Sequence, residues 1–306
     1  MATEYRMTGE VLDMDDEKYR SNDALNFSLA KHALKSPLAY AAAKVDDSKP
    51  TSAMELGTLA HSALLEPHKF AYKTMCAPEG ARRGSKAWND AQVTASAKGK
   101  KLVKQSEYDR AKRIADSVLS NPDAMTRLVT KDAAPWLTYE ERQEVEYGNT
   151  LEAADSRLEA SYFWTDQRTG LYLKARVDCV SYFDDFLCVV DFKTTEDASP
   201  RVMGHRLVAE PYHYLIQLAW YCRAIRSVYD QDLVNACIIA AEKGNGYTTG
   251  VYDLTIEDLE IADKKIDELL DTIVKIEAGE MDEQMHYKTI DLYPPDWWYK
   301  ENEGTM

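Results

Sequence analysis

Residues 171–193 read LYLKARVDCVSYFDDFLCVVDFK, and this stretch decides the fold. Its two halves, 171–182 and 186–193, are rich in β-branched, aromatic and aliphatic side chains, which is typical of strands. Asp184 and Asp185 between them predict the two-residue loop of a hairpin. The stretch therefore predicts a β-hairpin in which the numbers of cross-strand partners sum to 369, as those of Asp184 and Asp185 do.

This register brings charged side chains to one side of the hairpin. Asp178 would lie opposite Asp191, and Arg176 opposite Lys193. Because strand side chains alternate, Asp191 and Lys193 share a face. Opposed carboxylates repel, with β-carbons roughly 5 Å apart, so this arrangement is expected where a divalent cation lies between the acids. Lys193 would then be close enough to orient or deprotonate an attacking water. Alone, an Asp-x-Lys strand is also typical of a solvated face, so other segments must decide.

The composition is that of a soluble globular protein. The 306 residues are 45% hydrophobic and 29% charged, which suffices for a sizeable core. No run of about 18 apolar residues predicts a membrane span, and the first residues lack the apolar centre of a signal peptide. We therefore expect a cytoplasmic protein. Five cysteines without a Cys-x-x-Cys pair argue against a disulfide framework or a structural zinc site.

Charge is unevenly distributed along the chain. The net charge of −15 argues against a protein that coats nucleic acid without specificity. Residues 81–113 nevertheless contain ten Lys or Arg and three Asp or Glu, whereas residues 252–306 contain five and sixteen. The first segment is compatible with a surface that follows phosphates, and equally with a solvated helical face.

Hydrophobic periodicity predicts helices first, then a mixed sheet, a helix, two more strands and a final helix. The expected helices are residues 22–46 with a break at Ser36-Pro37, 52–66 with a capping box at Ser52–Glu55, 106–120, 211–229 and 255–278. The expected strands are 137–142, 158–165, the two halves of the hairpin, 233–241 and 247–254. Residues 79–100 are expected to form a polar loop. The pattern predicts an α/β (α+β) sandwich with a central mixed sheet of about five strands flanked by helices.

His61 lies in the predicted helix that starts near Ser52. Gly57, one turn earlier, would let this helix approach the sheet closely. A single histidine at such a position is also typical of a core or boundary residue. His61 is therefore a candidate ligand that depends on what surrounds it.

Two further candidates lie on the helix that follows the hairpin. Gln217 and Tyr221 are four residues apart and share a helical face, from which they could reach a phosphate or hold Lys193. The same spacing also occurs in ordinary amphipathic helices. Glu159, at the start of a strand beside the hairpin, and Arg176 are weaker candidates.

Taken together, these motifs resemble the RecB-type branch of the PD-(D/E)XK nuclease superfamily, and more specifically the exonuclease VIII (RecE-type) family, often found in phages and prophages. The resemblance spans roughly residues 8–280. The residues that carry it are LGTLAHSALLEP (56–67), KARVD (174–178), VDFKTT (190–195) and QLAWY (217–221), with residues 28–40 fitting the N-terminal region of the family. Each motif is weak alone, and their order and spacing make the set more specific.

The resemblance implies a restriction-endonuclease-like core and a role for each motif residue. His61, Asp178 and Asp191 would be side-chain metal ligands, with the backbone carbonyl of Phe192 as a further one. Lys193 would position or activate the attacking water. Gln217 and Tyr221 would hold Lys193 or the scissile phosphate. One or two Mg²⁺ ions suit hard oxygen ligands, and a histidine ligand would make Mn²⁺ an acceptable substitute.

The resemblance also implies a substrate and partners. The chain would be an exodeoxyribonuclease that degrades one strand of double-stranded DNA from its ends, 5′→3′, leaving 3′ overhangs for a single-strand annealing protein in phage-type recombination. It would assemble as a ring around DNA, as a tetramer. No cysteine follows Cys237, so no iron–sulfur cluster is expected. The candidates for the DNA-binding surface are Lys31, Lys35, Arg82, Arg83, Lys86, Arg176, Arg201 and Arg206.

On this basis residues 1–50 are expected to be an N-terminal helical region, 51–280 the nuclease core, and 281–306 an acidic tail. The aromatic residues 291–299 of this tail are expected to dock on this chain or on a neighbour. Two other functions stay open: a non-catalytic DNA-binding module of the same fold, and an endonuclease that acts on particular structures or in defence. An exonuclease needs a DNA end, whereas an endonuclease also nicks closed circles.

Overall fold

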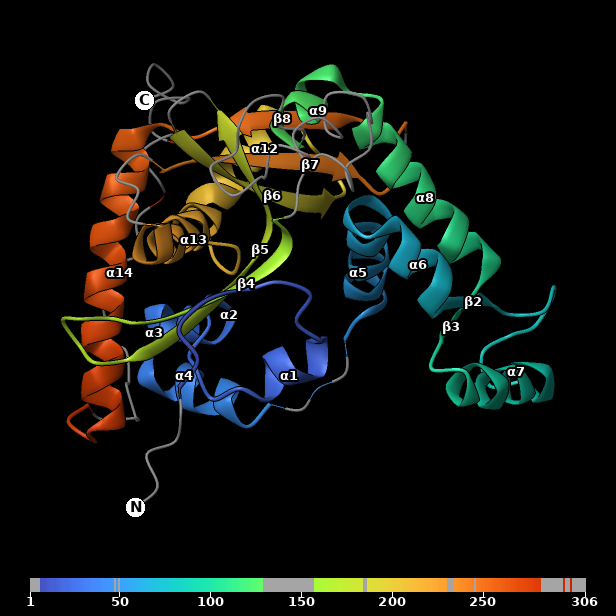
Figure 1. Ribbon diagram of the computed structural model, residues 1–306, viewed down its shortest axis with the longest axis horizontal. Coiled ribbons are helices and arrows are strands. Elements are labelled where there is room, and N and C mark those ends of the chain that lie inside the picture. The colour runs from blue at the N-terminus through green and yellow to red at the C-terminus, as the bar shows by residue number, and fades with distance from the viewer. Residues whose placement is uncertain are drawn as a thin grey trace.

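A computed structural model describes residues 6–46, 48, 50–128, 157–183, 186–229, 234–244, 246–281, 294 and 298. Its centre is a six-stranded sheet in the order β1-β4-β5-β6-β7-β8 (Figure 1). The strands are β1 (Gly9–Val11), β4 (Leu158–Thr165), β5 (Tyr172–Phe183), β6 (Phe186–Thr195), β7 (Val234–Glu242) and β8 (Thr249–Asp253). Only the β6–β7 pair is parallel among these strands. The predicted mixed sheet flanked by helices is confirmed, with β1, too short to show a pattern, as an additional edge strand.

Helices cover both faces of the sheet (Figure 1). One face packs against α2 (Phe27–Ala30), α3 (His32–Lys35), α4 (Pro37–Lys44), α13 (Tyr214–Tyr229) and α14 (Ile256–Glu277). The other face packs against α5 (Ser52–Leu65), α6 (Pro67–Lys73), α8 (Gln105–Leu119) and α9 (Pro122–Leu128). Strand β6 follows the alternation expected of a buried strand: Leu187 and Val189 face α13, and Cys188 and Val190 face α5. None of the described helices is long and apolar enough to cross a lipid bilayer.

The hairpin of residues 171–193 has the predicted register. Five consecutive pairs, from Phe183–Phe186 to Cys179–Val190, follow the sum of 369. The pairing ends there, so Asp178 is not a cross-strand partner of Asp191. The prediction that Arg176 lies opposite Lys193 is wrong. Arg176 pairs with Ser161 on β4, and Lys193 pairs with Ala240 on β7. The two strands therefore part at Asp178. The loop residues of the hairpin lie outside the described part of the chain.

Helix α5 is held close to the sheet by its glycine. A side-chain β-carbon at Gly57 would come within 3.2 Å of the hydroxyl oxygen of Thr194 on β6, which is tighter than ordinary contact. The helix begins at Ser52 as predicted, but its capping residue is Thr51, whose side chain accepts the hydrogen bond of the Met54 N–H, 3.3 Å away. The close approach at Gly57 places the next turn of α5, with His61, over the end of β6.

The prediction of a polar loop at residues 79–100 is wrong. Residues Lys86–Ala97 form α7, which lies beside the two-stranded parallel sheet of β2 (Thr74–Cys76) and β3 (Lys101–Val103) and projects from the body (Figure 1). Trp88, Ala91 and Ala95 recur at helical spacing and pack against Leu102. This small core is separate from the main one, so a short apolar stripe within polar sequence was enough to form the helix.

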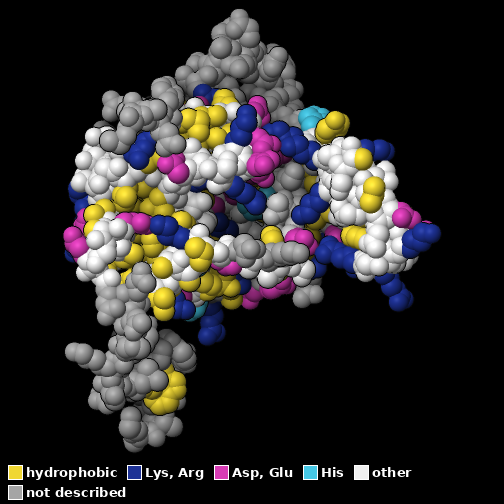
Figure 2. Space-filling model, turned by 90° about the horizontal axis from the view of Figure 1, so that it is seen from below, with side chains coloured by type: hydrophobic (Ala, Val, Ile, Leu, Met, Phe, Trp, Pro, Cys, Tyr) yellow, Lys and Arg dark blue, Asp and Glu magenta, His cyan; other side chains and the backbone are white. Residues whose placement is uncertain are grey.

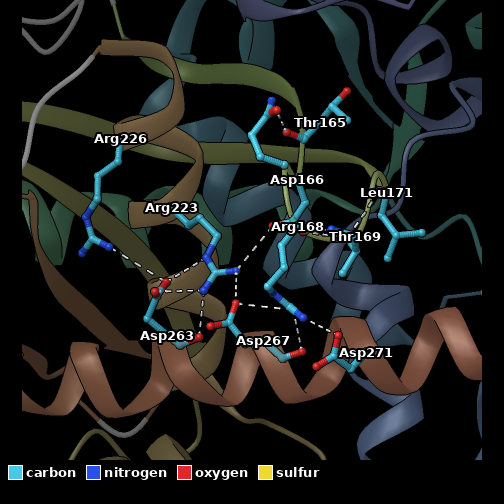
Figure 3. A network of polar contacts seen from close by, with 11 residues as sticks. Thr165, Asp166, Arg168, Thr169, Leu171, Arg223, Arg226, Asp263, Asp267 and Asp271 are labelled. Atoms are coloured by element: carbon cyan, nitrogen blue, oxygen red, sulfur yellow. Dashed lines mark hydrogen bonds and ion pairs between the residues drawn. The ribbon is translucent and has the colours of Figure 1, made fainter.

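A network of ion pairs fastens the β4–β5 turn to two helices (Figure 3). Arg223 of α13 donates to Asp263 and Asp267 of α14, with both Oδ1 contacts at 2.9 Å. Arg168 of the turn donates to Asp271 and to the backbone carbonyl of Asp267. Two short helices complete the fold, α1 (Asp16–Ser21) and α12 (Pro200–Val208). The predicted strand at 137–142 lies outside the described residues, as does the aromatic tail except for Pro294 and Trp298.

Candidate active site

Two neighbouring strands break their alternation at the same level. On β5, Val177 packs on the α13 side and Cys179 on the α5 side, although residues two apart should share a face. On β4, Leu158 and Ala160 differ in the same way. The pairs Leu158–Cys179 and Ala160–Val177 enclose Glu159, whose φ of 50° lies in the left-handed region that side chains rarely adopt. The break lets side chains from this level reach toward both helical layers.

Glu159 and Asp178 meet His61 of α5 at this break. Ligand atoms of the three side chains all lie within 4.8 Å of one another, a spacing that a single metal ion could bridge. Nδ1 of His61 is 3.5 Å from Oδ2 of Asp178. The same Oδ2 accepts a hydrogen bond of 2.7 Å from the backbone N–H of Phe192, in the place where a ladder bond between β5 and β6 would be expected. Asp178 thus joins the two strands where their pairing stops.

Asp191 and Lys193 follow on β6 and face α13, as their shared strand face predicts. Nζ of Lys193 donates to Oδ1 of Asp191 at 2.9 Å and to Oε1 of Gln217 at 3.1 Å. Nε2 of Gln217 donates to the hydroxyl of Tyr221 at 2.8 Å. Oδ2 of Asp191 is buried and lies 2.7 Å from Nζ, but it accepts no hydrogen bond. The chain of contacts from Asp191 to Tyr221 fixes the position of the lysine, and Oδ2 of Asp191 has its close ion-pair contact with that lysine.

Burial disfavours the negative charges of this cluster. It raises the pKa of Asp178 to about 6, although Lys193 and the Phe192 N–H oppose the shift. It also raises the pKa of Asp191, against the effect of Lys193 and with a contribution from Asp178. The pKa of Glu159 is raised well above its ordinary value, first by burial and then by Asp178. Three acids therefore share a space in which their charges are costly without a cation.

The two basic members of the cluster respond in opposite directions. Burial, followed by the nearby Lys193 charge, lowers the pKa of His61 to about 4, so the imidazole is neutral near pH 7 and free to act as a ligand. Burial alone would lower the pKa of Lys193, but Asp191 and Asp178 outweigh it and the net pKa is raised. Lys193 is therefore a fixed cationic donor.

The cluster lies between two cavities. One, of about 740 Å³, is bordered by Lys193, Gln217 and Tyr221. The other, of about 430 Å³, is bordered by the residues that lead into α1 and by helices α5 and α6. Thr58, His61, Glu159 and Arg176 line both. On the face seen in Figure 2 the surface is hollowed, and Lys and Arg side chains gather around the hollow. We call the larger cavity the cleft.

The predicted DNA-binding residues do not all lie together. Lys31 and Arg176 line the cleft. Arg176 is already engaged by Ser161, Asp16 and the carbonyl of Met14. The remaining candidates are placed as follows: Arg206 stacks on Tyr212, Arg83 binds Glu55 and Glu107 near the projecting helix, Arg82 and Lys86 are at that helix, and Lys35 and Arg201 are on α3 and α12 outside the cleft lining.

Glu159 is the residue that sequence reasoning undervalued. From the sequence it is only a weaker candidate, at the start of a strand beside the hairpin. The signal that identifies it, the simultaneous break of alternation on β4 and β5, depends on which helices cover each face and is not visible in the strand sequence alone.

The fold and the cluster define a PD-(D/E)XK-like nuclease domain. The chain belongs to the family described as PDDEXK-like domain of unknown function (DUF3799), whose profile matches residues 26–286. A candidate exonuclease from Eubacterium rectale, solved as a crystal structure at 2.19 Å, has a similar fold. It matches with a TM-score of 0.54 at 13% sequence identity, over 96% of this chain and 100% of that chain. No curated protein matches the sequence.

Proposed function

We propose that this protein is a divalent-metal-dependent exodeoxyribonuclease that degrades one strand of double-stranded DNA from its ends. The observation that carries the proposal is the convergence of two buried acids, the half-buried Glu159, a neutral histidine and a fixed lysine at one end of a ligand-sized cleft. Paired carboxylates of this kind are costly to bury unless a cation joins them.

The donor set fits a divalent cation. His61, Glu159 and Asp178 offer atoms within 4.8 Å of one another, and Asp191 adds a buried carboxylate that is paired with Lys193. Carboxylate oxygens suit Mg²⁺, and the imidazole makes Mn²⁺ equally acceptable. The backbone carbonyl of Phe192 would be a further ligand, since the N–H of this residue donates to Asp178 at 2.7 Å and its ring contacts that of His61. A cation bound here would stabilise negative charge on the phosphate and lower the pKa of water.

The residues of the chain would supply the remaining steps. Lys193 would hold a water or a phosphate oxygen through its N–H groups, because two of its contacts, Asp191 and Gln217, already fix its direction. Gln217 and Tyr221 would hold the Lys193 side chain in that direction while the geometry at the phosphorus atom changes during the displacement. The charged donor would stabilise the negative charge that develops during displacement.

The proposal includes the finer features that the resemblance implies. These are 5′→3′ polarity, 3′ overhangs passed to a single-strand annealing protein, and assembly as a ring-shaped homo-oligomer. They are supported by the motif resemblance to the RecE-type family. Strand-specific end labels would test polarity, and light scattering of the purified protein would test the oligomeric state.

The direct test is digestion of linear and covalently closed circular double-stranded DNA of the same sequence with Mg²⁺. Loss of the linear form alone, abolished by EDTA and by Lys193→Ala, is the expected result. Nicking of the circle would replace the exonuclease with an endonuclease. No cleavage of either form by a folded protein would contradict the nuclease proposal and favour a DNA-binding module.

A further inference from the structure

One wall of the cleft is built from two tyrosines in the segment that leads into α13. The rings of Tyr212 and Tyr214 have centroids 5.5 Å apart and are inclined by 62°. Nζ of Lys193 lies 4.9 Å from the Tyr214 ring centroid, and the guanidinium carbon of Arg206 lies 4.8 Å from that of Tyr212. The two neighbouring rings thus lie between two cations, Lys193 at the centre of the cluster and Arg206 at the other end.

Tyr212 is the exposed end of this series. Its side chain is 36% exposed and lines the cleft, whereas Tyr214 is half-buried behind it. The hydroxyl of Tyr212 makes no hydrogen bond within the described part of the chain. A ring that is open to solvent, with no hydroxyl bond to hold it, is available for contact with another flat group.

The backbone around Tyr212 is fixed on both sides. The N–H groups of Tyr212 and His213 both donate to the carbonyl of Ala209, at 3.0 and 3.2 Å. The carbonyl of Pro211 accepts a hydrogen bond of 3.1 Å from Nζ of Lys31. The ring is therefore presented by an ordered segment, which reduces the entropy that a ligand must overcome to bind it.

Positive charge without a carboxylate partner lies on the same side. Lys31 donates to the Pro211 carbonyl and Lys174 to the carbonyls of Tyr19 and Asn22, and neither forms an ion pair with any described residue. The smaller cavity differs, since Lys69 is bound there to Asp13 and Glu66. Lys174 is buried, so Lys31 is the lysine of the two that a ligand can reach, and a cation beside an exposed ring is the combination that binds the phosphates and bases of single strands.

We propose that the cleft takes an unpaired DNA strand, with a base stacked on Tyr212 and the adjoining phosphates beside Lys31. The proposal rests on the proposed function and narrows its substrate to a strand that has left the duplex. The cleft, of about 740 Å³, has room for one to a few nucleotides beside Lys193. In this proposal a blunt end frays before one of its strands enters the cleft.

The test uses a short single strand that carries 2-aminopurine near its end, whose fluorescence is quenched by stacking. Binding is measured with EDTA, so that no cleavage occurs, and again with Ca²⁺. Wild type and Tyr212→Phe should quench the probe equally. Tyr212→Ala should lose the quench and bind roughly 5- to 100-fold more weakly. Tyr72→Ala, an exposed tyrosine outside both cavities, is the matched control and should behave as wild type.

Unchanged quench and affinity in Tyr212→Ala would overturn the proposal, as would absence of binding by wild type in both buffers. The same strand in a duplex with a cross-linked terminal pair should bind at least about tenfold more weakly, because unpairing is then blocked. Equal binding of that duplex would also overturn it. If linear DNA is degraded but the quench does not depend on Tyr212, the stacking proposal is contradicted and the nuclease proposal is supported. If the quench depends on Tyr212 but no DNA is degraded, only the nuclease proposal fails.

Discussion

Helix α13 contributes to two clusters of charged side chains that differ in how far their acids are balanced by cations. Near its start, Gln217 and Tyr221 support Lys193 among the buried acids of the candidate active site. Two residues after Tyr221, Arg223 binds Asp263 and Asp267 in the network of Figure 3. In the network acids and arginines are nearly equal in number, and each acid has a cationic partner. In the active site, Glu159, Asp178 and Asp191 face one lysine.

This difference separates stabilising charge from functional charge. A cluster of matched charges at a partly exposed surface contributes modestly to stability and has no need of a ligand. A cluster of like charges in a buried space is destabilising until something neutralises it, and such a site is a candidate for binding or catalysis. Substitutions in the two clusters should therefore act on different quantities.

The largest expected effect comes from Asp191→Asn. Nuclease activity should fall by at least about 10²-fold, because the charge that holds both Lys193 and the cation is lost. Without metal, thermal unfolding should occur no lower than in wild type, since repulsion from Asp178 is relieved. Asp271→Asn in the network is the matched control and should keep full activity. A strongly destabilised Asp191→Asn variant would contradict this account of the buried acids.

Metal should stabilise the protein through the active site alone. Mn²⁺ or Mg²⁺ at 100 times its dissociation constant should add about 2.7 kcal/mol to the free energy of unfolding, seen as a higher Tm. Asp178→Asn should abolish most of this gain, and Asp263→Asn should keep it. An equal metal-induced rise of Tm in both variants would place the binding elsewhere.

Arg223→Ala should affect stability and leave activity unchanged. Its guanidinium is only 15% exposed and binds two aspartates, so its loss should cost about 2 kcal/mol, between the values for exposed and buried pairs. Urea unfolding would measure the change. Arg223→Lys should recover part of it. Loss of DNA degradation in a folded Arg223→Ala variant would mean that the network serves the active site as well.

The smallest effect is expected for Arg168→Ala. This arginine is 43% exposed and binds Asp271, so the loss should be below about 1 kcal/mol and should vanish in roughly 1 M salt. Urea unfolding at low and high salt would compare the two conditions. A larger, salt-independent loss would show that the β4–β5 turn depends on this contact for its packing.

Local pattern was sufficient to predict the register of the hairpin and the shared face of Asp191 and Lys193. A two-residue loop and the alternation of buried side chains determine which residues pair, and both are present in the sequence. Gly57 likewise predicted the close approach that brings His61 to the sheet. These features depend on neighbours within one or two elements.

Other features depend on tertiary packing and could not be predicted in this way. The strands part at Asp178 because Asp178 binds the Phe192 N–H, and Glu159 enters the site through a backbone conformation that no strand pattern indicates. The helix that contains Trp88 formed around a small core that it shares with Leu102 of the following strand, β3. Tyr212 depends on a segment anchored by Lys31, about 180 residues away.

The central claim is that His61, Glu159, Asp178 and Asp191 together hold a divalent cation. Anomalous diffraction from crystals of the protein soaked in Mn²⁺ tests it most directly. The account predicts a strong peak between these four side chains, with the peak absent in the Asp178→Asn variant. An empty cluster in a fully soaked crystal, or a peak confined to the acidic surface of α14, would contradict it.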